Sequence, residues 1–150
     1  MFEKASHLRT GRVSETGRIY LISTATIRRQ TFFSDWQLGR LVVAELRSQE
    51  HRGCARSIAW VLMPDHLHWL VQLHDGDISA LVLRVKCLSA QSINRALGTR
   101  GAVWQRGFHD RAIRREQDLQ AIARYIVRNP IRAGLVERVG DYPLWDACWI

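Results

Sequence analysis

The sequence feature that most constrains the fold is a pair of apolar runs, residues 56–63 and 66–73, separated by a Pro-Asp dipeptide. Two such runs divided by a turn-forming dipeptide predict two neighbouring strands that meet at or near a turn. Successive side chains on a strand point to opposite faces, so His66 and His68 share one face, roughly 7 Å apart. Two imidazoles held this way can chelate a metal ion, although a His-x-His pair is also common as a surface or hydrogen-bonded feature.

The rest of the chain is predicted to alternate strands and helices. The expected elements are a strand at 18–27, a helix at about 34–50, a helix at about 78–97, an interrupted strand within 102–113 and a helix at about 116–129. This order, β-α-β-β-α-β and then a helix, predicts an α+β fold: a ferredoxin-like split βαβ sandwich with an antiparallel sheet and helices packed on it. The face that carries the histidines stays open in this layout unless the last helix covers it.

Local signals support these boundaries. Ser34 followed by Gln37 fits a capping box for the first helix, and Pro130 is expected to stop the last one. There is no internal repeat, low-complexity tract or linker, so a single domain over 1–150 is predicted. Its expected parts are a basic arm (1–17), a core (18–136) and an aromatic tail (137–150) that docks on the core.

The charge balance favours a nucleic-acid partner. The chain has 22 Lys and Arg against 14 Asp and Glu, a net charge of +8, and almost all of the cations are Arg. Arg forms bidentate contacts with phosphate and stacks on bases, which Lys does poorly; the alternative is a basic surface with no polyanion partner. The three cysteines lack metal-site spacing, and no apolar run approaches ~18 residues, so reduced thiols and a cytoplasmic location are expected.

The predicted last helix presents a tyrosine beside an amide. Its apolar stripe is formed by Leu119, Ile122, Ala123 and Ile126, and Tyr125 lies at the margin of that stripe. At about 100° per residue, Asn129 follows Tyr125 one turn later at about 40° on the same edge. The tyrosine is either a reactive phenol or a residue at the core edge with its hydroxyl in water.

Together these residues resemble the single-tyrosine HUH transposases of the IS200-like superfamily, and within them the REP-associated tyrosine transposases. That superfamily carries His-hydrophobic-His after Met-Pro-(Asp/Asn), as at 63–68, and Tyr-Ile-x-x-Asn-Pro before a Gly-containing end, as at 125–136. The REP-associated branch adds three further motifs. They match residues 8–14 followed by 17–20, residues 104–110, and the Tyr-Pro pair at 142–143. The resemblance spans nearly the whole chain.

The resemblance implies a metal-dependent reaction on single-stranded DNA. His66, His68 and Asn129, where insertion-sequence relatives usually carry Gln, would hold Mg²⁺ or Mn²⁺. Tyr125 would be the nucleophile and would form a 5′-phosphotyrosine intermediate, so that DNA is cleaved and rejoined without ATP. The implied substrates are hairpins of REP-type palindromes, and the branch implies a monomer, whereas insertion-sequence relatives are dimers that share tyrosines.

The same resemblance, with the charge, indicates where DNA would bind. Lys86 matches a Lys common in the wider superfamily, and Trp104 is the tryptophan expected to stack on an unpaired base. The other candidate phosphate contacts are Arg9, Arg12, Arg84, Arg95, Arg106, Arg114, Arg115, Arg124 and Arg128.

Three alternatives stay open at this point. A domesticated transposase or an RNA-binding ferredoxin-like module would bind a hairpin without catalysis, although a pure binder needs neither the histidines nor Tyr125. A zinc hydrolase is disfavoured because no acidic residue is placed as a general base, and strand alternation puts Asp65 off the histidine face. Two imidazoles and an amide would suit Zn²⁺ or Mn²⁺ better than Mg²⁺, which prefers oxygen ligands.

Overall fold

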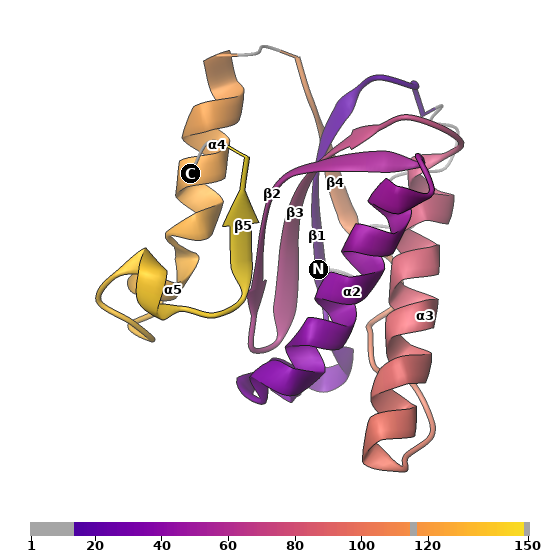
Figure 1. Ribbon diagram of the computed structural model, residues 1–150, viewed down its shortest axis with the longest axis vertical. Helices are drawn as coiled ribbons and strands as arrows, with labels where there is room; N and C mark the ends of the chain where they lie inside the picture. Colours follow the sequence, from indigo (N-terminus) through magenta and orange to yellow (C-terminus); the bar gives the residue numbers. More distant parts are fainter. Residues whose placement is uncertain (1–13, 115–116, 149–150) are drawn as a thin grey trace.

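The computed structural model describes residues 14–114 and 117–148, and within them one antiparallel sheet lies between two helical layers (Figure 1). The sheet has five strands in the order β4-β1-β3-β2-β5. The strands are β1 (Ile19–Ala25), β2 (Ala55–Met63), β3 (His66–Leu73), β4 (His109–Ile113) and β5 (Trp145–Ala147). The α+β, ferredoxin-like prediction is confirmed.

The helices cover both faces of the sheet. The helices α2 (Trp36–His51) and α3 (Ile78–Leu97) pack on one face, and α4 (Gln117–Val127) lies on the other, close to β2 and β5 (Figure 1). Shorter helical turns are η2 (Ile27–Arg29), η3 (Phe32–Ser34), α5 (Asn129–Arg132) and η4 (Val139–Asp141). Within the described residues no helix has the length and apolar content needed to cross a membrane.

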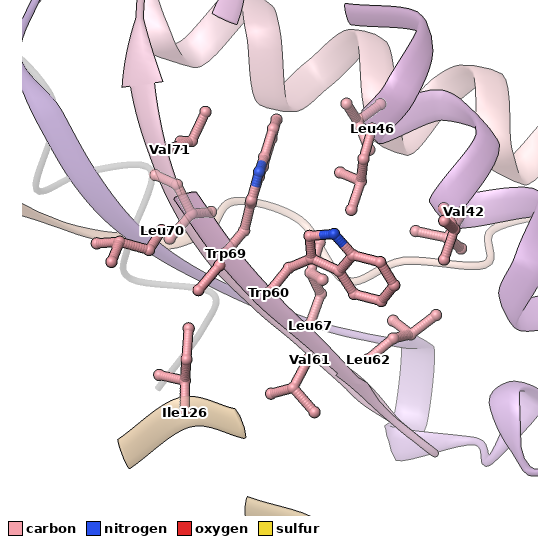
Figure 2. Packing of buried hydrophobic residues seen from close by; sticks show 14 of the residues in the cluster. Val42, Leu46, Trp60, Val61, Leu62, Leu67, Trp69, Leu70, Val71 and Ile126 are labelled. Atoms are coloured by element: carbon pink, nitrogen blue, oxygen red, sulfur yellow. The ribbon is translucent and has the colours of Figure 1, made fainter. Parts of the chain in front are cut away.

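The strand alternation divides the two faces of β3 as expected. Trp69 pairs with Trp60 of β2 on the face toward α2, where the Trp60 ring lies near Val42 and Leu46 (Figure 2). Trp69 is almost fully buried, and its Nε1 donates to Ser57 Oγ at 2.8 Å, so the indole loses no hydrogen bond by burial. The opposite face carries His66 and His68.

The face with the histidines is partly closed by α4. Ile126 of α4 lies across the sheet from the tryptophans, near Val61 and Leu70 (Figure 2). Leu119, Ala123, Ile126 and Val127 are buried, which is the apolar face of an amphipathic helix packed on a sheet. The last helix therefore covers part of the face that would otherwise stay open.

Three predicted boundaries were wrong for local physical reasons. The cap of α2 is Asp35, whose Oδ1 accepts from the Gln37 backbone N–H at 3.0 Å, and Ser34 belongs to the preceding η3 turn. The predicted strand within 102–113 is reduced to β4, because Gly107 has a positive φ of 71° and the chain before it is a loop. The helix predicted to 129 ends at Val127, and a separate turn, α5, follows it.

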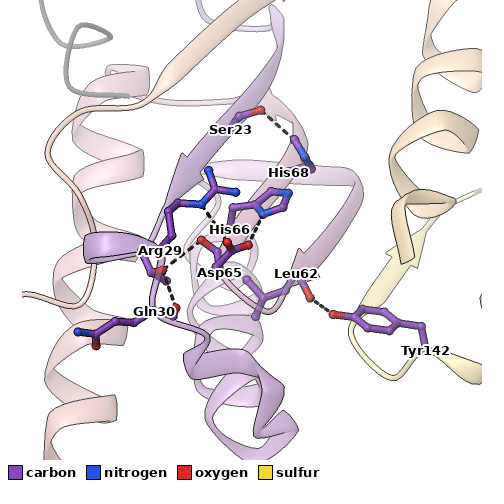
Figure 3. A network of polar contacts seen from close by, with 9 residues as sticks. Ser23, Arg29, Gln30, Leu62, Asp65, His66, His68 and Tyr142 are labelled. Carbon is purple, nitrogen blue, oxygen red and sulfur yellow. Dashed lines mark hydrogen bonds and ion pairs between the residues drawn. The ribbon is translucent and has the colours of Figure 1, made fainter. Parts of the chain in front are cut away.

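The aromatic tail docks as predicted. β5 pairs with the outer edge of β2, and the hydroxyl of Tyr142 donates to the Leu62 carbonyl at 2.6 Å (Figure 3). Leu144 packs so closely on α2 that a Cβ at Gly39 would lie 2.5 Å from its Cδ1 atom. Gly39 thus permits the close approach of the helix and the tail.

Candidate active site

The two histidines are each fixed through the same ring nitrogen. His66 Nδ1 donates to Asp65 Oδ1 at 2.7 Å, and His68 Nδ1 shares a hydrogen bond with Ser23 Oγ at 2.9 Å (Figure 3). The ring centroids are 4.8 Å apart and the planes are nearly perpendicular. Among the described residues, Nε2 of neither ring takes part in a hydrogen bond. Both rings are therefore oriented by the protein and keep one nitrogen for a further ligand.

Asp65 contacts His66, although strand alternation predicted that it would lie off the histidine face. It lies in the turn between β2 and β3, where strand alternation does not apply, and its second oxygen accepts from Arg29 Nε at 2.9 Å (Figure 3). Burial raises the pKa of Asp65, but the hydrogen bonds from His66 and Arg29 outweigh burial and hold the pKa below its usual range. The ionised carboxylate thus orients His66, and the earlier placement of Asp65 off the histidine face was wrong.

Arg29 reaches Asp65 from an unusual stretch of backbone. Arg28 and Arg29 have φ angles of 51° and 55°, in the left-handed region that side chains other than glycine rarely adopt. Such a conformation costs free energy on the order of 1–3 kcal/mol per residue and persists where the surroundings enforce it. The sequence around Arg29 carried no signal for this turn, so Arg29 was missed.

The environment of His68 favours the neutral imidazole. Burial and, to a smaller extent, the positive charges of His66, Arg132 and Arg29 together lower the pKa of His68 to about 4. At neutral pH the ring is therefore uncharged and has one nitrogen without a proton, as a metal ligand must. This electrostatic setting suits the predicted metal role.

Helix α4 brings the predicted nucleophile to the same place. A cavity of about 420 Å³ is lined by Ser23 and His68 of the sheet and by Tyr125, Ile126 and Asn129 of the helical segment. Tyr125 is 64% exposed, whereas Asn129 is half-buried. Three of the predicted site residues, His68, Tyr125 and Asn129, thus line one cavity within one chain.

The predicted metal ligands fit a weak and open site. The described residues contain no cluster of three or more His, Cys, Asp or Glu side chains able to hold a metal ion. A site here therefore depends on the two imidazole Nε2 atoms and on the amide oxygen of Asn129, which lines the same cavity as His68. Such a donor set fits a divalent cation that completes its coordination with water and substrate oxygens.

The predicted DNA contacts lie in several environments. Arg9 and Arg12 lie outside the described residues, as does Arg115. Arg84 is half-buried and donates from Nε to Gln49 Oε1 at 3.1 Å, which links α3 to α2. The exposed candidates are Arg95, Arg106, Arg114, Arg124 and Arg128. Contact of these side chains with phosphate stays a prediction.

Lys86 is tied to a loop. Its Nζ donates to the backbone carbonyls of Gln105 and Gly107, both at 2.7 Å, and burial lowers the pKa of Lys86 to about 8. The ammonium therefore fixes the loop before β4. A contact between Lys86 and phosphate stays a prediction, to which the structure adds this structural role.

Trp104 is a core residue. Its ring is only 7% exposed, packs on Phe33 at a centroid distance of 5.4 Å, and donates from Nε1 to Ser89 Oγ at 3.0 Å. A ring with both a packed face and a satisfied N–H is not presented to a base, so the stacking prediction was wrong. Val103, Trp104 and Phe108, the apolar residues that suggested a strand here, belong to a loop whose side chains are buried in the core.

Comparisons with known proteins agree with this arrangement. The family model described as "Transposase IS200 like" matches residues 16–129, well over half of the chain. A Haemophilus influenzae protein named as a REP-associated tyrosine transposase is 29% identical over 132 residues, covering 77% of this chain and 71% of its own. The REP-associated tyrosine transposase of Escherichia coli is 33% identical over 87 residues, or 57% of this chain and 50% of its own. This chain thus spans about half the length of the Escherichia coli relative.

Solved structures show the same likeness. A REP-associated tyrosine transposase bound to a REP hairpin has a TM-score of 0.69 at 26% identity, covering 89% of this chain and 79% of that one. A Deinococcus radiodurans protein has a TM-score of 0.56 at 22% identity, covering 77% and 93% of the two chains, which shows the shared fold alone. The chain therefore belongs to the IS200-like transposase family, and its relatives within that family are REP-associated tyrosine transposases.

Proposed function

We propose that this protein binds single-stranded DNA hairpins of the REP type and cleaves and rejoins them through Tyr125. The observation that carries the proposal is that Tyr125 and Asn129 line the same cavity as His68, although His68 is far from them in the sequence. A pure binder would not need a phenol, an amide and an imidazole brought together. The cavity is also formed within one chain, which supports activity as a monomer.

His66, His68 and Asn129 are the residues that would hold Mg²⁺ or Mn²⁺. A bound divalent cation supplies Lewis-acid chemistry, because it withdraws charge from the scissile phosphate. The protein prepares this site by fixing Nδ1 of each histidine, through Asp65 and Ser23, and by keeping the His68 ring neutral.

Tyr125 would perform the covalent step. Its phenolic oxygen attacks the phosphorus, the bond between phosphorus and the 3′ oxygen of the preceding nucleotide breaks, and the phenol proton leaves to solvent. The departing oxygen takes up a proton and becomes a free 3′-hydroxyl, while the DNA 5′ phosphate stays esterified to the tyrosine. Attack by a 3′-hydroxyl on this ester reverses the step, so rejoining needs no ATP.

The positive surface would bind the DNA itself. A relative of 26% identity is seen bound to a REP hairpin, and the chain has a net charge of +8. Exposed arginines of the helical segment, such as Arg124 and Arg128, would contact phosphates without reading the base sequence. Binding should therefore weaken steeply as salt rises.

The test is covalent capture of a labelled single-stranded hairpin in the presence of Mn²⁺ or Mg²⁺. We expect a protein–DNA adduct that is lost with EDTA and lost in Tyr125→Phe. The matched control is Tyr20→Phe, since the Tyr20 hydroxyl is buried and accepts from the Glu15 backbone N–H at 3.0 Å. An adduct that survives Tyr125→Phe contradicts the nucleophile assignment. A wild-type protein that binds the hairpin but forms no adduct is a non-catalytic binder.

A further inference from the structure

The helical segment that carries Tyr125 is interrupted just after it, and the interruption folds an arginine back. Pro130 has no N–H to donate to the carbonyl four residues earlier, so the helix cannot continue regularly through it. The turn α5 starts at Asn129, and the N–H groups of Ile131 and Arg132 both donate to the Arg128 carbonyl. In an uninterrupted helix the seven residues from Tyr125 to Arg132 would span about 10 Å of axis.

Instead, Arg132 contacts Tyr125 in two ways. Its guanidinium carbon lies 3.8 Å from the centroid of the Tyr125 ring, over the ring face. One of its terminal N–H groups also donates to the Tyr125 backbone carbonyl. That carbonyl lies in the last turn of α4, whose carbonyls have no partner within the helix itself. A side chain held at both the ring and the backbone of the same residue restricts that residue's rotamer.

The contact is notable because Tyr125 is otherwise open. The side chain is 64% exposed, and within residues 14–114 and 117–148 Arg132 makes the only cation–π or ring contact with it. An exposed tyrosine without such a contact would sample several rotamers. A planar guanidinium also attracts the ring face more strongly as negative charge develops on the phenol oxygen.

We infer that Arg132 is a positioning residue, which holds the Tyr125 phenol in the orientation needed for attack on the scissile phosphate. This inference rests on the proposed function and deepens it, since it names the group that orients the nucleophile. Arg132 acts before and during the covalent step, and it acts through the tyrosine. A nucleophile displaced by about 1 Å can lose a factor on the order of 100 in rate.

The test compares Arg132→Gln with wild type in single-turnover adduct formation, at hairpin concentrations that saturate both proteins. We expect the rate to fall about 10- to 100-fold, and the fall to persist at saturation. Arg52→Gln removes the same charge from an exposed residue just after α2, and we expect its rate to match wild type. Thermal unfolding of each variant shows whether it is folded.

Two further variants separate stacking from charge. Arg132→Lys keeps the positive charge but lacks the planar guanidinium group. We expect a rate between those of wild type and Arg132→Gln. Arg132→Ala should be partly rescued by free guanidinium ion, whereas Arg52→Ala should show no response to it. A purely structural role for Arg132 predicts no rescue.

The outcomes distinguish this inference from the proposed function. A wild-type protein without any adduct overturns both. A wild-type adduct together with an unchanged rate in Arg132→Gln overturns the positioning role alone. A loss that disappears at saturating hairpin also overturns it, because Arg132 would then contribute only to DNA affinity.

Discussion

Removal of the Asp65 carboxylate tests how His66, a proposed metal ligand, is oriented. Asp65→Ala deletes the acceptor of two hydrogen bonds, from His66 Nδ1 at 2.7 Å and from Arg29 Nε at 2.9 Å. Loss of such an orienting partner typically lowers metal affinity about 10- to 100-fold, which is about 1–3 kcal/mol of binding free energy. We therefore expect weaker Mn²⁺ binding by that factor, measured by calorimetric titration.

The effect of Asp65→Ala on stability should be smaller than the loss of two hydrogen bonds suggests. The Asp65 side chain is 23% exposed, and the Arg29 side chain is 46% exposed, so solvent screens their ion pair. The partly buried bond to His66 dominates, and a loss of about 1–2 kcal/mol in unfolding free energy is expected. Urea unfolding measures it.

Two variants make the result decisive. Asp65→Asn keeps an oxygen that can accept from His66, so we expect it to retain most of the Mn²⁺ affinity. Asp141→Ala removes an equal charge from an exposed ion pair with Arg138 and should bind Mn²⁺ as wild type does. If folded Asp65→Ala also binds Mn²⁺ with wild-type affinity, Asp65 does not orient a ligand and the reasoning fails.

Three other predictions concern stability. The folded pKa of His68, about 4, lies below its ordinary value of 6.5, so the unfolded state binds more protons than the folded state and stability decreases as the pH is lowered. The loss should be about 2 kcal/mol between pH 7 and pH 5 in urea unfolding, and a His68→Gln variant with the same pH dependence would contradict it. Trp104→Ala should cost about 3–5 kcal/mol in unfolding free energy. If the variant loses only DNA affinity and no stability, the ring stacks on a base and is not a core residue. Lys86→Met leaves two carbonyls without their donor, at a cost of about 1–3 kcal/mol, and hydrogen exchange should rise at 105–107. Unchanged exchange there would mean that Lys86 does not fix the loop.

Patterns with a strict period predicted the centre of the fold well. The two apolar runs became β2 and β3, the turn fell at 64–65, and the helix predicted at about 78–97 is α3. These elements were predictable because alternation and helical periodicity are local properties of the chain. The interrupted strand was not, since Val103, Trp104 and Phe108 are buried by tertiary packing of a loop, which no local period records.

In the candidate site, too, some residues could be predicted from the sequence and others could not. His66, His68, Tyr125 and Asn129 were predicted from sequence motifs, and the cavity groups three of them. The groups that orient them were missed, because none of these contacts follows from a local period in the sequence. Ser23 meets His68 through the register of β1 on β3, and Arg29 reaches Asp65 through a left-handed turn. Arg132 contacts Tyr125 across the break between α4 and α5.

Tyr125 is proposed to react with DNA at the face of the sheet that carries the two histidines. Mass spectrometry of the proteolysed covalent complex tests it most directly. We predict one modified peptide, in which Tyr125 carries the 5′-phosphorylated end of the cleaved hairpin and the released fragment ends in a 3′-hydroxyl. A nucleotide attached to Tyr20, Tyr142 or any other residue, or a cleaved hairpin without any protein-bound phosphate, would contradict it.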